Sequence, residues 1–357
     1  MKRPYQAEVI VLGGGPVGLM AALELSKDHP TTLIARRLPS SEDAPRVEAV
    51  PASLLALLVE FGIHPRQIGV EGLHESRWLA WEQEAVVETR APVAAHIERP
   101  SLDVALLNSA VACGRVNIVL SHHHDDFKAV LEAAGRNDVR LIDATGRRSL
   151  SARNRMQPAK PWAARTFLAL RHSCRASPEL RIAALPGGFV YRLGSCKHIV
   201  LGIVGRNKTI MGSPLDLERQ LLERGVGWIL EGLPAMTDLT PGKCSTASVQ
   251  WTKGGVGWRV GDAALARDTV SSQGLATGIS DALHCAAALR GDDATLLTQR
   301  QDEQRGTHLR SLEQLIARCR FREEAAWSEY AEFVSDKLDP KPADFKVALT
   351  AGRLTLA

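Results

Sequence analysis

The chain has 357 residues, of which 45% are hydrophobic, and a formal net charge of +4, so its length predicts two structural units. The mild, dispersed charge argues against nucleic-acid partners, and no apolar window approaches the roughly 18 residues of a membrane span. The six cysteines are scattered without a C-x-x-C pair, so we expect a cytoplasmic protein with reduced thiols and no metal site.

The first predicted element is a strand over Val9–Leu12 that leads into a glycine-rich turn. Gly13, Gly15 and Gly18 fill the G-x-G-x-x-G spacing of dinucleotide-binding sites. The first glycine permits the tight bend, the second lets a pyrophosphate approach the backbone, and the third lets helix and strand pack closely. The N–H groups and dipole of the following helix favour phosphate. The pattern therefore predicts a dinucleotide site at the end of this strand.

The end of the second predicted strand, over Thr31–Ala35, departs from this fingerprint. A Rossmann site normally carries Asp or Glu about 20 residues after the glycines, where it holds the adenosine ribose. Here that position is Ala35, and Arg36 and Arg37 follow it. Three interpretations stay open: an NADP site in which arginine binds the 2′-phosphate, a flavin nucleotide whose ribose is held differently, or two solvated arginines.

The later elements alternate in the first half of the chain and become β-rich in the middle. We predict a helix over 54–61, strands over 77–81 and 85–88, a helix from Ser101 to about Gly114, and strands over 116–120 and 139–142. The segment between Leu120 and Val139 is interpreted as a shortened strand pair. Short strands separated by Gly and Pro follow, and then a strand, an Ala-rich helix and charged helices.

This order of elements predicts an α/β fold. We expect a Rossmann-like nucleotide-binding domain formed by 1–163 and 252–292, with a mixed or antiparallel β-sheet substrate domain inserted at 164–251. A C-terminal helical segment is expected over 293–357.

A second group of small and polar residues lies within 259–281, where a strand leads through a loop into a helix. Small residues let backbone run against a ligand, and a helix N-terminus offers N–H groups to an anionic group. Asp262 is suited to accept a hydrogen bond from a ribose or ribitol hydroxyl. The members of this group are Gly261, Asp262, Ser271, Ser272, Gln273, Gly274 and Gly278.

Together these motifs resemble the FAD-dependent monooxygenase superfamily of the p-hydroxybenzoate-hydroxylase type. The chain is most similar to its tryptophan-halogenase-like branch, which includes flavoprotein maturases of quinone-cofactor enzymes. The turn at 143–149 matches the D-A-T-G-R-x-S element of the family, and the paired serines before Gly274 are the most specific match. Further matches are Arg46, Glu48 and Pro51 of an R-x-E-x-x-P-like stretch, Arg99 and Asp103 of a W-x-x-R-x-x-x-D stretch, and Glu324 and Trp327 near the end.

The resemblance implies FAD as the cofactor, molecular oxygen as co-substrate, and NAD(P)H or a flavin reductase as electron donor. Reduced flavin would form a flavin hydroperoxide that oxidises an electron-rich substrate, while the protein positions the groups and excludes water. We predict Glu48 as a general base or substrate anchor and Gln273 as a stabiliser of charge on the flavin. The predicted FAD-binding residues are Gly13, Gly15, Pro16, Val17, Gly18, Arg36, Arg46, Arg99, Gly261, Asp262, Ser272, Gln273, Gly274 and Gly278.

The predicted activity is hydroxylation or oxidation of an aromatic group in a peptide or protein precursor, because a shortened strand pair favours an open site. The alternatives are a monooxygenase of a free aromatic metabolite and a degenerate flavoprotein fold that binds a partner without turnover. Flavin halogenases, as the resemblance implies, need a lysine in the first half of the fold, and none lies between Lys27 and Lys128. Their G-W-x-W-x-I-P stretch is replaced here by residues 188–194, so halogenation is not expected.

Overall fold

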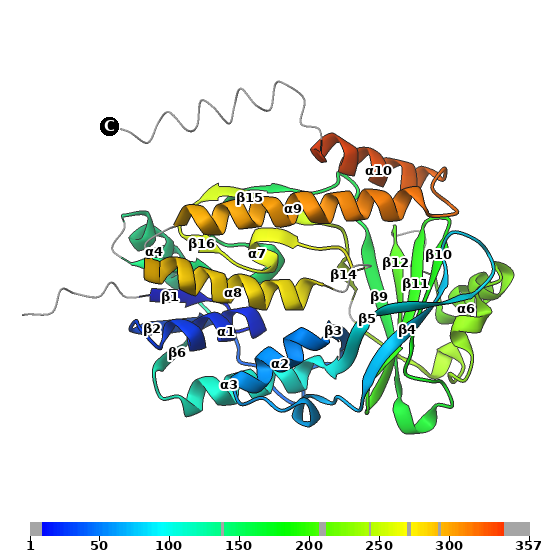
Figure 1. Cartoon of the computed structure of the whole chain (residues 1–357), viewed down its shortest axis with the longest axis horizontal. Helices are drawn as coiled ribbons and strands as arrows, with labels where there is room; N and C mark the ends of the chain where they lie inside the picture. Colours follow the sequence, from blue (N-terminus) through cyan, green and yellow to red (C-terminus); the bar gives the residue numbers. More distant parts are fainter. Residues whose placement is uncertain are drawn as a thin grey trace, which may run out of the picture.

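The computed structural model describes residues 9–136, 139–206, 212–242, 244–269, 273–291 and 294–338. It shows two main sheets side by side, with helices packed around the first and the long helix α9 (Ala294–Ala317) extending across both (Figure 1). A smaller two-stranded sheet joins β8 (Ala152–Met156) to β15 (Gln250–Gly255).

The first main sheet is parallel and has five strands in the order β16-β7-β1-β2-β6. Strand β1 is buried on both faces: Val9 and Val11 belong to the core under α1, whereas Ile10 and Leu12 face α4. The carboxyl end of β1 thus reaches the glycine turn from the centre of the sheet. The strands are β1 (Val9–Leu12), β2 (Thr31–Ala35), β6 (Val116–Leu120), β7 (Arg140–Asp143) and β16 (Trp258–Arg259).

Helices cover both faces of the parallel sheet. On one face α1 lies between α3 and α8, and on the other face lies α4. In the segment between Leu120 and Val139, where the sequence suggested a trimmed strand pair, the structure has the helix α4. Phe127, Leu131 and Ala134 are spaced by three or four residues and so pack one helix face on the sheet. The helices are α1 (Pro16–Leu25), α2 (Ala52–Glu60), α3 (Arg99–Ala112), α4 (His124–Gly135) and α8 (Gly274–Gly291).

The second main sheet is mixed and has nine strands. Its main path runs β13-β9-β12-β11-β10-β4-β5-β3, and β14 also pairs with β9. Neighbours are antiparallel except for β10 and β4, which are parallel. The predicted α/β class with a mixed sheet is therefore confirmed. The strands are β3 (Val47–Pro51), β4 (Leu73–Ala80), β5 (Val87–Glu98), β9 (Ala163–Leu170), β10 (Leu180–Leu185), β11 (Gly188–Gly194), β12 (His198–Gly205), β13 (Thr240–Pro241) and β14 (Ser245–Thr246).

Strands β3, β4 and β5 come from the segment that the sequence assigned to the nucleotide-binding domain. The predicted boundary at residue 164 separates strands that the structure joins, since Leu180 of β10 pairs with Arg77 of β4. This pairing connects residues about 100 positions apart, and no local pattern of hydrophobic residues reveals such a register. Apart from this boundary, the division into domains stays a prediction.

The C-terminal helices α9 and α10 (Ala325–Leu338) close an aromatic core against the large sheet. Trp327 is fully buried, donates its indole N–H to the Leu185 carbonyl at 2.8 Å, and meets the Trp162 ring at 4.6 Å. Two shorter helices are α6 (Pro214–Glu223) and α7 (Asp262–Leu265). Within the described ranges, no helix combines the length and the hydropathy needed to cross a membrane.

Candidate functional site

A cavity of about 730 Å³ lies where the loops of the parallel sheet meet the large sheet. This volume falls within the roughly 300–1,000 Å³ of small-molecule and cofactor sites. One end is formed by backbone and charged side chains from the loops. The other end is formed by apolar side chains of the large sheet, namely Leu168, Leu180, Ile182, Phe189, Leu193 and Val200.

The glycine turn forms one wall of this cavity and begins α1. Gly13 has φ +113°, and a Cβ there would overlap the Ala144 carbonyl, while a Cβ at Gly18 would overlap the carbonyl of Gly13. A Cβ at Gly15 would meet no atom within 4 Å. Gly13 and Gly18 are therefore required by the turn itself, whereas Gly15 leaves room for a ligand. Of the predicted residues in this turn, Gly13, Gly15, Pro16 and Val17 line the cavity, and Gly18 lies behind it.

The second predicted glycine pair, Gly261 and Gly278, lies behind the cavity wall. A Cβ on Gly278 would be 2.7 Å from Val17 Cγ2, and one on Gly261 would be 3.3 Å from the Gly278 Cα. These glycines let α1, α7 and α8 approach one another, so the structure assigns them to packing and not to the lining. Gly274, at the start of α8, does line the cavity.

Asp262 is the predicted hydroxyl acceptor, and its carboxylate lines the cavity. Burial raises the pKa of Asp262, and the positive charge of Arg147 opposes this effect. No side chain or backbone group of the described residues donates a hydrogen bond to this carboxylate. A buried carboxylate needs hydrogen bonds, so Asp262 is suited to accept them from a ligand.

Arg99, the first residue of α3, makes a central ion pair of the site. Its Nη1 lies 2.6 Å from Glu48 Oε1 on β3, and its Nε lies 2.7 Å from Asp103 Oδ1. Burial raises the pKa of Asp103, and Arg99 opposes this rise. The structure thus brings Arg99 and Glu48 together, and two nitrogens of Arg99 bind carboxylates of the protein itself. The pair fixes the position of the Glu48 side chain at the cavity wall.

The loop before α8 carries the predicted flavin-edge residues. The Gln273 amide oxygen accepts from Arg267 Nη1 at 2.9 Å, and the side chain is exposed and absent from the cavity lining. The predicted contact of the Gln273 side chain with the cavity is therefore absent, whereas Gly274 at the start of α8 lines the cavity. Ser272 and Ser271 lie outside the described residues.

Arg147 lines the cavity and was not predicted as a site residue. Its Nη1 donates to the Ser248 carbonyl at 2.6 Å and its Nη2 to the Arg267 carbonyl at 2.8 Å. It lies in the turn at 143–149, where the Asp143 carboxylate is fully buried and accepts from the Thr145 and Ser151 N–H groups. Asp143 thus shapes the turn, and the arginine that follows it faces the cavity. The arginine of the D-A-T-G-R-x-S element was the signal that sequence analysis left unused.

Arg36 and Arg46, both predicted to bind FAD, line the cavity. The Arg36 guanidinium lies 5.4 Å from the centre of the Phe127 ring, which is within the range of a cation–π contact. Arg46 is exposed, and its carbonyl accepts from the Arg99 N–H at 2.8 Å.

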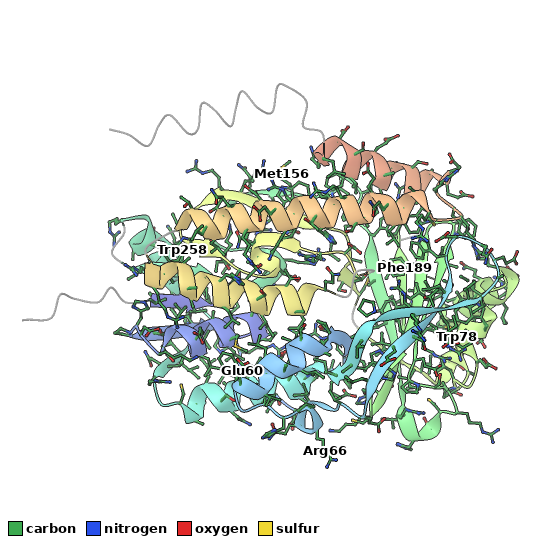
Figure 2. All side chains as sticks on the ribbon, viewed as in Figure 1. Glu60, Arg66, Trp78, Met156, Phe189 and Trp258 are labelled. Carbon is green, nitrogen blue, oxygen red and sulfur yellow. The ribbon has the colours of Figure 1, made fainter. Side chains whose placement is uncertain are left out.

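Tyr191 on β11 is a further cavity residue that sequence analysis did not single out. Burial, together with the negative charge of Glu48, raises the pKa of Tyr191 to about 12. Its ring lies over Gly202, where a Cβ would overlap the ring. Phe189, Tyr191 and Leu193 alternate along β11 and so share one face. Figure 2 shows Phe189 inside the molecule, toward the parallel sheet, whereas Trp78 lies near α6. The alternation of these residues along β11 was the signal in the sequence that could have identified Tyr191 as a cavity residue.

Residues 6–153 match the family described as FAD binding domain. This part of the chain is similar to FAD-binding domains. The match contains the glycine turn, the Arg99 ion pair and the turn that carries Arg147. No curated protein matches the chain in sequence.

Solved structures share the fold of the whole chain. The peptidyl tryptophan dihydroxylase QhpG, described as essential for tryptophylquinone cofactor biogenesis, has a TM-score of 0.69 and 16% identity over 91% of this chain and 78% of its own. The flavin-dependent halogenase CmlS has a TM-score of 0.67 and 16% identity over 99% and 71%. A tryptophan halogenase from Shewanella frigidimarina NCIMB 400 has a TM-score of 0.68 and 14% identity over 96% and 83%. The predicted resemblance is thus confirmed at the level of the fold.

The groups that line the cavity fit FAD. The open space at Gly15 and the N-terminus of α1 suit a pyrophosphate. The cavity-facing carboxylate of Asp262 suits a hydroxyl donor, and the first residue of α8, Gly274, brings a helix N-terminus to the lining. Beyond these polar groups, the apolar face of β9–β12 suits a flat ring.

Proposed function

We propose that this protein is an FAD-dependent monooxygenase that hydroxylates or oxidises an aromatic side chain in a peptide or protein. The observation that supports it is one continuous cavity, which joins the polar end that fits FAD to an apolar wall of the large sheet. Bound FAD would supply the activation of molecular oxygen, with electrons from NAD(P)H or from a flavin reductase. The residues of the chain position the substrate ring and exclude water.

The substrate ring would pack against the apolar wall, beside Phe189 and Leu193. Glu48 lies where this wall meets the polar end, and its Oε1 accepts from Arg99. A carboxylate held in this way can accept a hydrogen bond from an indole N–H or a phenol O–H. We therefore assign Glu48 to anchoring the substrate.

A peptide substrate is favoured over a free metabolite by the likeness to QhpG, which acts on a peptidyl tryptophan and aligns with 91% of this chain. The segment between Leu120 and Val139 does not add support for an open site, because α4 fills it.

Oxygenation is favoured over halogenation by the chemistry of the cavity wall. Among the described residues, no lysine lines the cavity. Halogenases of this fold were expected to need such a lysine in the first half of the chain. We therefore expect the product to gain oxygen and not halide, even when bromide is present.

The test supplies the purified protein with FAD, NADH or NADPH, a flavin reductase and bromide. Tryptophan- or tyrosine-containing peptides are compared with the free amino acids, and products are analysed by mass spectrometry. Gain of oxygen on a peptide ring supports the proposal. Turnover of free aromatics only, a brominated product, or FAD binding without any product would each contradict it.

A variant pair tests the anchoring role. Glu48→Gln should raise the KM for the aromatic substrate more than it lowers kcat, because the amide forms a weaker hydrogen bond. Glu60→Gln is the matched control, since Glu60 is exposed at the end of α2, away from the cavity (Figure 2). Equal kinetics for both variants would remove Glu48 from the site.

A further inference from the structure

The end of β2 lacks the carboxylate that normally holds the adenosine ribose. Ala35 stands at this position and is 1% exposed. Its methyl group closely approaches the glycine turn, because a Cβ on Gly14 would lie 2.8 Å from the Ala35 Cβ. If FAD binds at this turn, another residue must supply the acceptor for the ribose hydroxyls.

Asp43 places a carboxylate on the same part of the cavity wall. It lies in the loop that follows β2 and lines the cavity together with Gly14, Arg36 and Arg37. Its Oδ1 accepts from Arg37 Nη1, and its Oδ2 accepts from the Ser40 N–H at 3.2 Å. The loop therefore holds the carboxylate in a fixed direction, and each oxygen can still accept a further hydrogen bond.

Asp43 is suited to remain charged in this position. Burial tends to raise the pKa of Asp43, but the hydrogen bonds from Arg37 and the Ser40 N–H outweigh it, so the pKa is lowered. An ionised carboxylate accepts stronger hydrogen bonds from hydroxyl groups than a neutral acceptor does.

The ion pair between Arg37 and Asp43 also affects which nucleotide the site can bind. Arg37 directs Nη1 at Asp43, and Arg36 lies over the Phe127 ring. A 2′-phosphate placed here would meet the negative charge of Asp43 beside the arginine that would have to bind it. The loop therefore favours a ribose with free hydroxyls.

We propose that Asp43 accepts hydrogen bonds from the adenosine ribose of FAD and replaces the acidic residue that is missing at Ala35. The proposal rests on FAD being the cofactor of the proposed function, but not on the reaction or its substrate. It makes Asp43 a binding residue of the FAD-binding domain and excludes a 2′-phosphorylated nucleotide from this site.

The first test measures FAD affinity by flavin fluorescence on the purified protein without substrate. Asp43→Asn should weaken FAD roughly tenfold or more, as expected for loss of a charge-assisted hydrogen bond. Glu42→Gln is the matched control, because Glu42 lies on the same loop but does not line the cavity. Equal FAD affinity in the wild type and Asp43→Asn, or equal loss in both variants, overturns the proposal.

A second test uses competitors, and its main comparison is made on the wild-type protein. The wild-type protein should bind ADP more tightly than 2′,3′-dideoxy-ADP and more tightly than 2′-phospho-ADP, and Asp43→Asn should bind ADP and dideoxy-ADP about equally. A wild type that does not distinguish ADP from dideoxy-ADP, or that prefers the 2′-phosphate, overturns the proposal.

The two proposals fail in different ways. Normal FAD binding with a loss in Asp43→Asn, but no oxygenated product, refutes the proposed function and leaves Asp43 in its role. Oxygenated product with unchanged FAD affinity in Asp43→Asn overturns the role of Asp43 alone. A wild-type protein that binds no FAD overturns both.

Discussion

Arg99 Nη1 lies 2.6 Å from Glu48 Oε1, and this ion pair connects the first residue of α3 to strand β3 of the large sheet. Burial lowers the pKa of Arg99, but Glu48 and Asp103 outweigh this effect, so the pKa is raised. The guanidinium therefore stays charged and holds the α3 start against the large sheet at the cavity wall.

Replacing Arg99 should destabilise the protein. Arg99→Gln leaves the Asp103 carboxylate buried without its partner, and we expect a loss of roughly 3 kcal/mol in the free energy of unfolding. Arg99→Lys should lose less stability but should still disturb Glu48, because an ammonium group cannot reproduce the two directed contacts. Urea unfolding measures both. Arg219→Gln, which removes an exposed pair with Asp216, is the control and should change stability little. A loss in Arg99→Gln no larger than in this control would contradict the assigned role.

Two glycine variants should separate folding of the turn from binding of FAD. Gly15 has φ −80°, and an added methyl meets no protein atom within 4 Å, so Gly15→Ala should fold normally and bind FAD more weakly. Gly13→Ala should lose stability, because Gly13 has φ +113° and its Cβ would overlap the Ala144 carbonyl. Thermal unfolding and FAD titration check the pair. If Gly15→Ala unfolded at a lower temperature than Gly13→Ala, the roles assigned to the two glycines would be reversed.

Asp262 should matter more for FAD than for folding. Asp262→Ala is expected to weaken FAD by about 1.5–3 kcal/mol, the range of a hydrogen bond to a charged group. Stability without FAD should not fall, because the carboxylate is buried and receives no hydrogen bond from the described residues. Asp262→Asn should have the smaller effect on FAD, since its amide oxygen still accepts. Isothermal titration and urea unfolding test this, and unchanged FAD affinity in Asp262→Ala would show that the residue does not contact the cofactor.

Asp281 on α8 should make stability depend on pH. Burial raises the pKa of Asp281 from 3.8 to about 6. The folded state favours the protonated form of Asp281, and this preference stabilises the protein. The stabilisation is fully present below about pH 4 and is lost as pH rises through 6. The shift of about two pKa units corresponds to roughly 3 kcal/mol. Asp281→Asn should remove this loss of stability between pH 4 and 7, as measured by urea unfolding. Asp302→Asn, at an exposed position on α9, is the control and should keep the wild-type pH dependence.

The glycine turn could be predicted from the sequence because its requirement is local. Gly13 must take a positive φ and Gly18 must allow contact with the preceding turn, and both demands arise within six residues. The buried strand before the turn follows from a run of four apolar residues. These features suffice to predict a nucleotide site, but they do not distinguish FAD from NADP.

The composition of the large sheet could not be predicted in the same way. Strands β4 and β10 pair across a long stretch of chain, and each alone has only a weak pattern of alternation. The helix α4 was also missed, because its apolar residues are few and lie among charged ones.

The sequence by itself determined the glycine turn, the mixed α/β class and the polar groups that end the strands, because backbone sterics and hydrophobic periodicity act over a few residues. Only the tertiary structure decided that Gly278 faces Val17, that Arg99 serves Glu48 and Asp103, and that Tyr191 and Asp43 reach the cavity. Such contacts depend on the packing of distant elements, which fixes direction and distance, and residue type alone gives neither.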